Sequence, residues 1–235
     1  TSLLIDPSEE LKQLSNPYDS SLRIQEKVYY FWDFAYYKGK YFVYFGIGPE
    51  LVFYLPYFLI TGTHLPNPIP IMISEIFLFF EEIVIRYYQR KIPLGLSLLL
   101  SSATVLGSGA FFIARRPDLY SVPIMMGLAL TIWGLFFWLK SRQTDQSLNC
   151  KTLFIGSCFM AFVAACRPQL ILGSFLAFLF FLPELKNLKE KQNQKYLMVA
   201  LLPYVIIAAG LMYYNWIRFD SPFDFGSSYN LTTND

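Results

Sequence analysis

The sequence has little charge and almost no histidine. Charged residues make up 15% of its 235 positions, against about 25% in an average soluble domain. His64 is the single histidine, which argues against a His-rich metal centre or a histidine-based catalytic triad within these residues. The low charge favours a chain that lies in a membrane over one that folds in water.

Cysteine is scarce as well. The three cysteines, Cys150, Cys158 and Cys166, follow one another at intervals of eight residues in one apolar segment. They lack CxxC spacing and nearby histidine, so neither a disulfide framework nor a metal site is indicated. We expect buried apolar thiols, and we predict a protein that needs no metal and no cofactor.

Apolar residues are abundant instead. They make up 54% of the chain, and aromatic residues alone make up 19%. Several apolar runs reach about 17–25 residues, the length that crosses roughly 30 Å of hydrocarbon as a helix. We therefore predict an all-α fold, a polytopic transmembrane helical bundle with about six spans. The expected spans are 69–86, 93–114, 120–139, 152–166, 169–183 and 197–216.

The basic residues are distributed unevenly between the connections. The connections 86–91, 140–151 and 184–195 hold ten lysines and arginines, while the alternate connections and the C-terminal tail hold four. Because cytoplasmic loops are enriched in Lys and Arg, we expect the first three connections to face the cytoplasm. Residue 68 is then external, and 69–217 form a transmembrane core.

The apolar stretch 42–62 has two interpretations. As a full span it would place 1–41 in the cytoplasm, whereas as an interfacial or re-entrant segment it would leave 1–68 in one external loop. Glu50 is costly at the centre of a bilayer, and the many tyrosines and phenylalanines suit the membrane interface. Two glycines and two prolines also interrupt the run. We therefore expect an interfacial helix at about 49–62.

Four arginines fall on the external side, where positive charge is disfavoured. Arg115 and Arg116 end one expected span, and Arg167 lies in a tight turn between two others. A planar guanidinium pairs bidentately with phosphate, so these three arginines are expected to bind a lipid-linked phosphate or pyrophosphate. The alternative, which is stronger for Arg218, is a long side chain that reaches from a helix end into water.

The N-terminal region places acidic, basic and aromatic residues on the same side. Carboxylates act as general bases toward hydroxyl groups, which makes Asp33 and Asp19 candidate catalytic residues. Aromatic faces with polar edges suit sugar rings. The candidate substrate-binding residues are Arg23, Tyr36, Tyr37, Lys38 and Tyr41. For each carboxylate the alternative is an ordinary solvated surface position.

Five motifs resemble, in the same order, those of a group of bacterial polytopic membrane proteins. They are NPYD (16–19), WDFAYYKGKYFVYFGIGPELVFYLPYFLITG (32–62), RRPDLY (115–120), CRPQ (166–169) and YNWIRFDSPFDFGSSYNLT (214–232). Those proteins are similar to glycosyltransferase family 39 and to the wider C-type (GT-C) superfamily of lipid-sugar glycosyltransferases. Two positions depart from the pattern: Glu50 stands where a second proline is expected, and Asp220 gives FDSP where FGSP is commoner.

The resemblance implies an inverting hexosyltransferase that moves a sugar from a polyprenyl-phosphate donor to an acceptor at the extracytoplasmic face. It also implies a catalytic Asp or Glu in a long first external loop, usually just after the first span. The sequence starts at Thr1 and ends in a polar segment. We therefore expect a fragment that lacks the first span and the C-terminal part, with 218–235 as the start of a later external segment.

The expected location is the bacterial cytoplasmic membrane. The expected partners are the lipid bilayer, the lipid-linked sugar donor and a glycan, lipid or protein acceptor, with no nucleic acid. A non-enzymatic polytopic protein, such as a lipid-linked saccharide transporter or an envelope-assembly factor, is the alternative. Transporters place ionisable residues along their spans, whereas here Glu75, Glu81 and Glu82 share one expected span. This distribution favours chemistry at the outer face.

Overall fold

In the computed structural model the chain is mostly helical, in agreement with the helical class expected from the sequence. It divides into two compact units, which we call unit 1 (Thr1–Phe45 with Ala208–Asp235) and unit 2 (Gly46–Ile207). The structure describes residues 6–43, 46–88, 93–107, 109, 112, 113, 115, 117, 118, 120–142 and 147–233.

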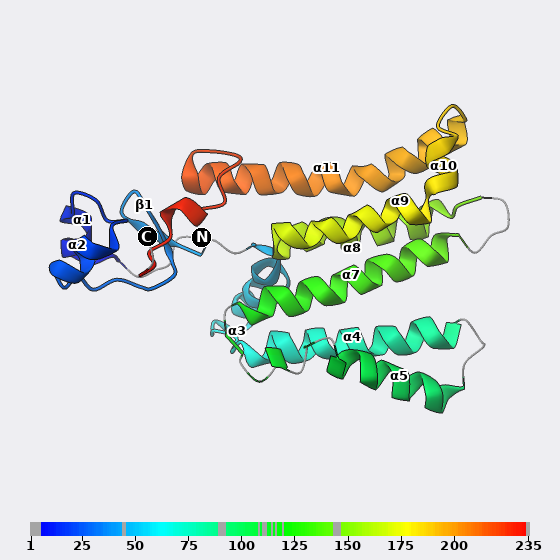
Figure 1. Ribbon diagram of the computed structural model, residues 1–235, viewed down its shortest axis with the longest axis horizontal. Helices are drawn as coiled ribbons and strands as arrows, with labels where there is room; N and C mark the ends of the chain where they lie inside the picture. The colour runs from blue at the N-terminus through cyan, green and yellow to red at the C-terminus, as the bar shows by residue number, and fades with distance from the viewer. Residues whose placement is uncertain are drawn as a thin grey trace. The chain divides into compact units, whose positions relative to one another are not determined.

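Unit 2 is built from helices that lie side by side. Its longer elements are α4 (Pro68–Tyr88), α5 (Leu94–Gly107), α7 (Ser121–Ser141), α8 (Cys150–Cys166) and the first part of α11 (Lys191–Phe219). α7 packs between α4 and α8, as Figure 1 shows. Because α8 returns antiparallel to α7 (Figure 1), Arg167, which directly follows α8, lies at the end of the unit where α7 begins.

Glycines allow α7 and α8 to approach closely. A Cβ atom on Gly156 would lie 2.9 Å from the carbonyl oxygen of Gly134, and one on Gly134 would lie 2.6 Å from the Met160 side chain. Trp138 of α7 then donates from Nε1 to Ser157 Oγ of α8 at 3.2 Å. Small residues at such contacts are typical of helix pairs in membranes.

The number of helices that can cross a membrane is smaller than predicted. Among the described residues, two helices are long and apolar enough, α7 and α11, so the prediction of about six spans is wrong. Only 11% of the apolar window of α11 is buried, against 56% for α7. α11 therefore differs from the buried core helix of a soluble protein, and it supports a membrane protein.

Parts of the other expected spans form shorter apolar helices. Among the described residues these include Pro68–Phe79 of α4 and α8. The expected span 169–183 does not form one helix. Its residues are divided between the 3₁₀-helix η2 (Pro168–Phe175), α9 (Leu176–Phe180) and the start of α10 (Leu182–Lys186). A 3₁₀ segment of this length replaces regular α-helical bonding near Pro168.

The stretch 42–62, as far as it is described, contains a short helical segment. A π-helix, η1 (Glu50–Tyr54), continues into α3 (Leu55–Thr61), which ends at Gly62 with φ 69°. At about 1.5 Å per residue these two elements reach roughly 18 Å, well short of the hydrocarbon thickness of about 30 Å. Phe53 packs against α7 and α8, and Tyr54 Oη donates to Asn67 Oδ1 at 2.7 Å.

Unit 1 is a small mixed fold. It contains α1 (Glu9–Gln13), α2 (Ser20–Gln25), the strands β1 (Ala35–Tyr37) and β2 (Lys40–Phe42), the end of α11, and the 3₁₀-helix η3 (Ser227–Tyr229). β1 and β2 form an antiparallel hairpin in the register Ala35 to Phe42. Its two-residue turn, Lys38-Gly39, has positive φ at both positions, 46° and 75°, as the twist of a tight hairpin requires.

Candidate functional site

Residues from the two ends of the sequence meet in unit 1. Asp33 donates its backbone N–H to Leu231 O at 2.8 Å, and Leu231 returns a hydrogen bond to Phe34 O at 3.0 Å. Ala35 forms an isolated β-bridge with Asn230. The motif that starts at Trp32 and the motif that ends at Thr232 are therefore parts of one structure.

This contact positions Asp33. Asn230 Nδ2 donates to Asp33 Oδ1, and the backbone of Asp33 has φ 64°. A left-handed conformation is uncommon outside glycine, although aspartate tolerates it better than most residues. The carboxylate is half-buried and is held by a side chain that follows it by 197 residues in the sequence.

A second carboxylate, Asp220, lies at the end of α11 beside the hairpin turn. Its Oδ2 accepts from Lys38 Nζ at 2.6 Å and from Tyr37 Oη at 3.0 Å. The hydrogen bond from Lys38, followed by the one from Tyr37, holds the pKa of Asp220 below its ordinary 3.8. The same bond to Asp220 raises the pKa of Lys38 above 10.5. The pair is therefore fully charged at neutral pH.

Aromatic rings surround this pair. The Tyr229 ring lies 4.6 Å from that of Tyr37, 5.5 Å from that of Phe219 and 6.1 Å from that of Tyr18, measured between centroids. Partial burial, and then a hydrogen bond with Asp224, raise the pKa of Tyr229 to about 12. We call the set Tyr18, Tyr37, Lys38, Phe219, Asp220 and Tyr229 the aromatic–carboxylate cluster.

Four of the six residues of this cluster were not among the site residues expected from the sequence. Tyr37 and Lys38 were expected at a substrate site, whereas Tyr18, Phe219, Asp220 and Tyr229 were not. The motif at 214–232 contains the last three, but nothing in a linear sequence indicates that this segment folds against the N-terminal hairpin.

Three other expected substrate-binding residues are buried in unit 1. Arg23, which is 1% exposed, donates to Pro17 O at 2.6 Å and to Thr232 O, and its guanidinium lies 4.7 Å from the Tyr30 ring centroid. Tyr36 and Tyr41 belong together to one apolar cluster of buried side chains. These side chains hold the N- and C-terminal segments of the unit together.

Asp19 has a local structural role. It is the N-cap of α2, and its Oδ1 accepts from Ser21 N at 2.9 Å, from Ser21 Oγ at 2.6 Å and from Leu22 N at 3.4 Å. The hydrogen bond from the Ser21 hydroxyl, and then that from its amide, lower the pKa of Asp19. One carboxylate oxygen is thus used in satisfying the open end of the helix.

The four arginines that were expected on the external side have different surroundings. Arg115 is exposed, and Arg116 lies outside the described residues. Arg167 is half-buried in unit 2, in extended backbone directly between α8 and η2. Arg218 is buried in unit 1, where it donates to Val43 O at 2.8 Å and to Asn215 Oδ1 at 2.9 Å and lies over the Tyr214 ring.

Glycines of the 46–48 segment lie next to the turn that carries Arg167. A Cβ atom on Gly46 would meet Ala165 O at 1.9 Å, and one on Gly48 would meet Cys166 Sγ at 2.9 Å. Residues 46–48, which lie inside the motif at 32–62, therefore contact the end of α8 within unit 2, one or two residues before Arg167.

Comparison with protein-family models, with curated proteins and with solved structures gave no match. Within the described part of the chain, no three His, Cys, Asp or Glu side chains gather as a metal site would require. The described residues thus form a mostly helical protein in which two helices have membrane-crossing length and a polar aromatic cluster lies at the end of one of them, α11.

Proposed function

We propose that the protein is a bacterial membrane glycosyltransferase of the C-type architecture, similar to glycosyltransferase family 39. It would transfer a sugar from a polyprenyl-phosphate donor to an acceptor at the extracytoplasmic face of the cytoplasmic membrane. One observation carries the proposal. Two of the motifs behind the resemblance, at 32–62 and 214–232, meet in unit 1 and bring Asp33 and the aromatic–carboxylate cluster to the end of α11.

The packing of unit 1 bears on which side of the membrane this site faces. α11 starts in the lysine-rich connection 184–195, which the charge distribution assigns to the cytoplasm, and it ends at Phe219. Residues 33–38 contact residues that follow this end, Asp220 and Leu231. If α11 crosses the membrane, the N-terminal region shares the external compartment, which supports an interfacial location for 49–62.

Asp33 is the stronger candidate for the catalytic base. Asp19 uses a carboxylate oxygen in capping α2, whereas Asp33 is oriented by Asn230 from the second motif. In the proposed reaction the base removes the proton of the acceptor hydroxyl, whose oxygen attacks the anomeric carbon. The bond between that carbon and the phosphate oxygen breaks, and the lipid phosphate leaves with the electron pair.

We propose that arginine binds the lipid phosphate of the donor. In unit 2, Arg167 follows the last residue of α8 directly and precedes Pro168, and Arg115 and Arg116 precede α7 in the sequence. A planar guanidinium pairs bidentately with phosphate. The exposed ring of Tyr18 and the half-buried rings of Tyr37 and Tyr229 offer apolar faces with polar edges, the surface that suits a sugar ring.

The test uses the full chain in liposomes with a radiolabelled polyprenyl-phosphate hexose and membrane extract as the source of acceptor. We expect Asp33→Asn to lower transfer by roughly 10²–10⁴-fold, the usual contribution of a general base, with donor binding kept. Asp19→Asn is the matched control, because asparagine also caps a helix well, and it should retain most of the activity.

A measurement of donor binding tests the role of Arg167 separately from that of Asp33. We expect Arg167→Ala to weaken binding of the labelled donor at least tenfold, while Lys151→Ala, which removes an exposed cation from a basic connection, leaves binding unchanged. Unchanged donor binding in Arg167→Ala would contradict the phosphate role. Donor binding by the wild-type chain without any sugar transfer would favour the alternative, a lipid-linked saccharide transporter.

A further inference from the structure

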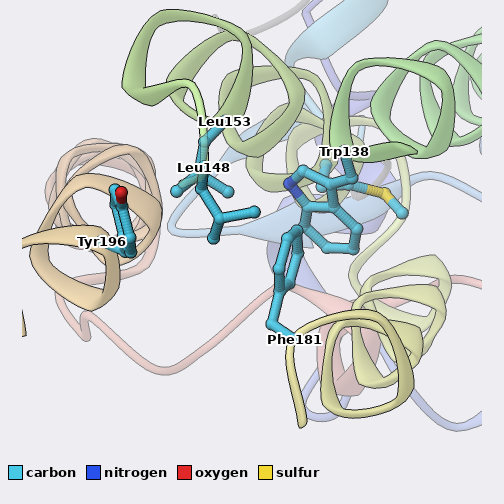
Figure 2. Packing of buried hydrophobic residues seen from close by; sticks show 6 residues of the cluster. Trp138, Leu148, Leu153, Phe181 and Tyr196 are labelled. Carbon is cyan, nitrogen blue, oxygen red and sulfur yellow. The ribbon is translucent and has the colours of Figure 1, made fainter. Parts of the chain in front are cut away.

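A pocket of about 380 Å³ lies in unit 2 between α7, α8, η2, α9, α10 and the first part of α11. Its volume is in the range of small-molecule sites, about 300–1,000 Å³. Figure 2 shows part of the lining, with Trp138 facing Phe181 and with Leu148 and Leu153 directed toward Tyr196 of α11. None of these residues belongs to the proposed catalytic site.

The polar groups of the lining already have partners within the protein. Trp138 donates a hydrogen bond to Ser157, and the hydroxyl of Tyr204 donates one to Ser174. The hydroxyl of Tyr196 accepts a hydrogen bond from Gln192. The two remaining polar residues of the lining are also engaged, Glu184 with Arg142 and Asn193 with Asn187. The surface left for an occupant is therefore hydrocarbon, since a polar ligand would find few donors or acceptors to replace its water.

The wall between η2, α9 and α11 faces outward. Leu172 and Phe175 are each 62% exposed, and Phe178 and Leu201, which also line the pocket, are 57% and 50% exposed. In a membrane protein such apolar side chains lie in the hydrocarbon of the bilayer. A lipid chain can thus enter the pocket sideways without crossing water.

One end of the pocket carries positive charge. Leu185, Leu188, Asn193 and Tyr196 line it, and lysines stand close to them in the sequence. The exposed residues Lys186, Lys189, Lys191 and Lys195 outnumber the single exposed acid among them, Glu190. Basic groups at the cytoplasmic edge of an interhelical pocket are suited to anionic lipid headgroups.

We propose that this pocket binds an acyl chain of an anionic glycerophospholipid from the cytoplasmic leaflet, with its phosphate on the lysines from the end of α10 to the first turns of α11. The apolar lining fits the chain, and the lysines complement the headgroup charge. The lipid fills the space between α11 and the α7–α8 pair, and it thereby stabilises the packing of the first part of α11 against them.

The test measures quenching of Trp138 by lipids that carry bromine on the acyl chain. In the full chain with Trp32, Trp133 and Trp216 changed to Phe, Trp138 is the single tryptophan. Brominated phosphatidylglycerol or phosphatidylcholine is added to the protein in a neutral detergent. We expect half-maximal quenching at about tenfold less phosphatidylglycerol than phosphatidylcholine, since each lysine near a headgroup contributes roughly fivefold at best.

Two sets of variants distinguish the effect of the lysine charges from the effect of the pocket volume. Changing Lys186, Lys189 and Lys191 together to Gln should move the phosphatidylglycerol curve onto that of phosphatidylcholine. The same change at Lys12, Lys27 and Lys40 of unit 1 should have no effect. Ala200→Phe or, in a second variant, Ala177→Leu fills the pocket and should reduce quenching by both lipids, with helicity checked by circular dichroism.

Equal quenching midpoints for the two lipids in the unmodified pocket would overturn the proposal, as would full quenching in both filled-pocket variants. So would loss of the headgroup preference in the unit 1 lysine control, because that result would mean a general effect of net charge. None of these readouts depends on sugar transfer, so the result is separate from that of the proposed function.

Discussion

Single charged residues serve two purposes in unit 1. Arg23 and Arg218 are buried, and their guanidinium groups donate to backbone carbonyls of distant segments. Lys38 and Asp220 form an exposed pair at the end of α11. A guanidinium has five donors in a fixed plane, which lets one arginine join several carbonyls, whereas an exposed lysine can be reached by a substrate.

The exposed pair leads to a prediction about pH. Asp220 has a lowered pKa, so its contribution is present above the ordinary 3.8 and is lost as pH falls through the folded pKa. Lys38 has a raised pKa, so its contribution is present below 10.5 and is lost at higher pH. Because the pair is exposed, we expect Asp220→Asn to lower the melting temperature only slightly at neutral pH.

The measurement compares wild type and Asp220→Asn by thermal unfolding followed by tryptophan fluorescence. The small difference between them should be present at about pH 7 and should close as the pH falls through the lowered pKa of Asp220. Glu26→Gln, which removes another exposed carboxylate of unit 1, is the control and should not differ from wild type at neutral pH. A difference for Asp220→Asn that persists unchanged at acid pH would mean that the pair is not its origin.

Helix contacts in unit 2 depend on where glycine stands. Gly134 and Gly156 let α7 and α8 approach, and Gly46 lies against the carbonyl of Ala165. In contrast, a Cβ atom added at Gly210, in the part of α11 that belongs to unit 1, would meet nothing within 4 Å. The same residue type therefore has opposite consequences at different positions, depending on the elements that pack there.

We expect Gly46→Ala to destabilise the protein by about 1–3 kcal/mol, the usual cost of overpacking, since its Cβ would lie 1.9 Å from a backbone oxygen. Gly210→Ala should stabilise it by roughly 0.5–1 kcal/mol, because alanine favours a helix interior. Loss of monomeric protein after heating, followed by size-exclusion chromatography, reports both changes. A stability shift of the same sign in the two variants would contradict the close approach at Gly46.

At the scale of the whole molecule, the proposed orientation in the membrane can be tested in each unit. Unit 1 joins the N-terminal hairpin to the residues after α11, and in unit 2 Tyr54, the last residue of η1, donates a hydrogen bond to Asn67. If α11 crosses the bilayer in the direction that the basic loops predict, the hairpin is external, and the same charge distribution predicts an external side for residues near 67.

Cysteine labelling in intact cells tests this arrangement. In a background with Cys150, Cys158 and Cys166 changed to Ala, cysteines at exposed Tyr29, Thr63 and Phe223 should react with a membrane-impermeant maleimide. A cysteine at exposed Lys189 should react only after the membrane is permeabilised. Labelling of Tyr29 and Phe223 from opposite sides would rule out the packing of unit 1 in the membrane, and labelling of Tyr29 and Thr63 from opposite sides would mean that 42–62 cross it.

The sequence predicted the helical class well and the number of spans poorly. Hydropathy counts apolar residues, and it therefore treats 169–183 like a continuous helix, although the segment that begins at Pro168 is 3₁₀ through Phe175. The sequence alone also left Asp19 and Asp33 as equal candidates for the catalytic carboxylate. Capping of α2 by the first and orientation of the second by Asn230 depend on contacts that a linear pattern does not contain.

The sequence by itself determined that this chain is helical, rich in apolar surface and asymmetric in its basic loops, because these properties follow from composition and spacing. The tertiary structure alone decided which polar residues meet. Lys38 and Asp220 are separated by 182 positions and share a hydrogen bond because α11 brings the chain back to the hairpin. Which arginines are buried, and which pocket remains open beside α11, likewise depend on packing between elements that are distant along the chain.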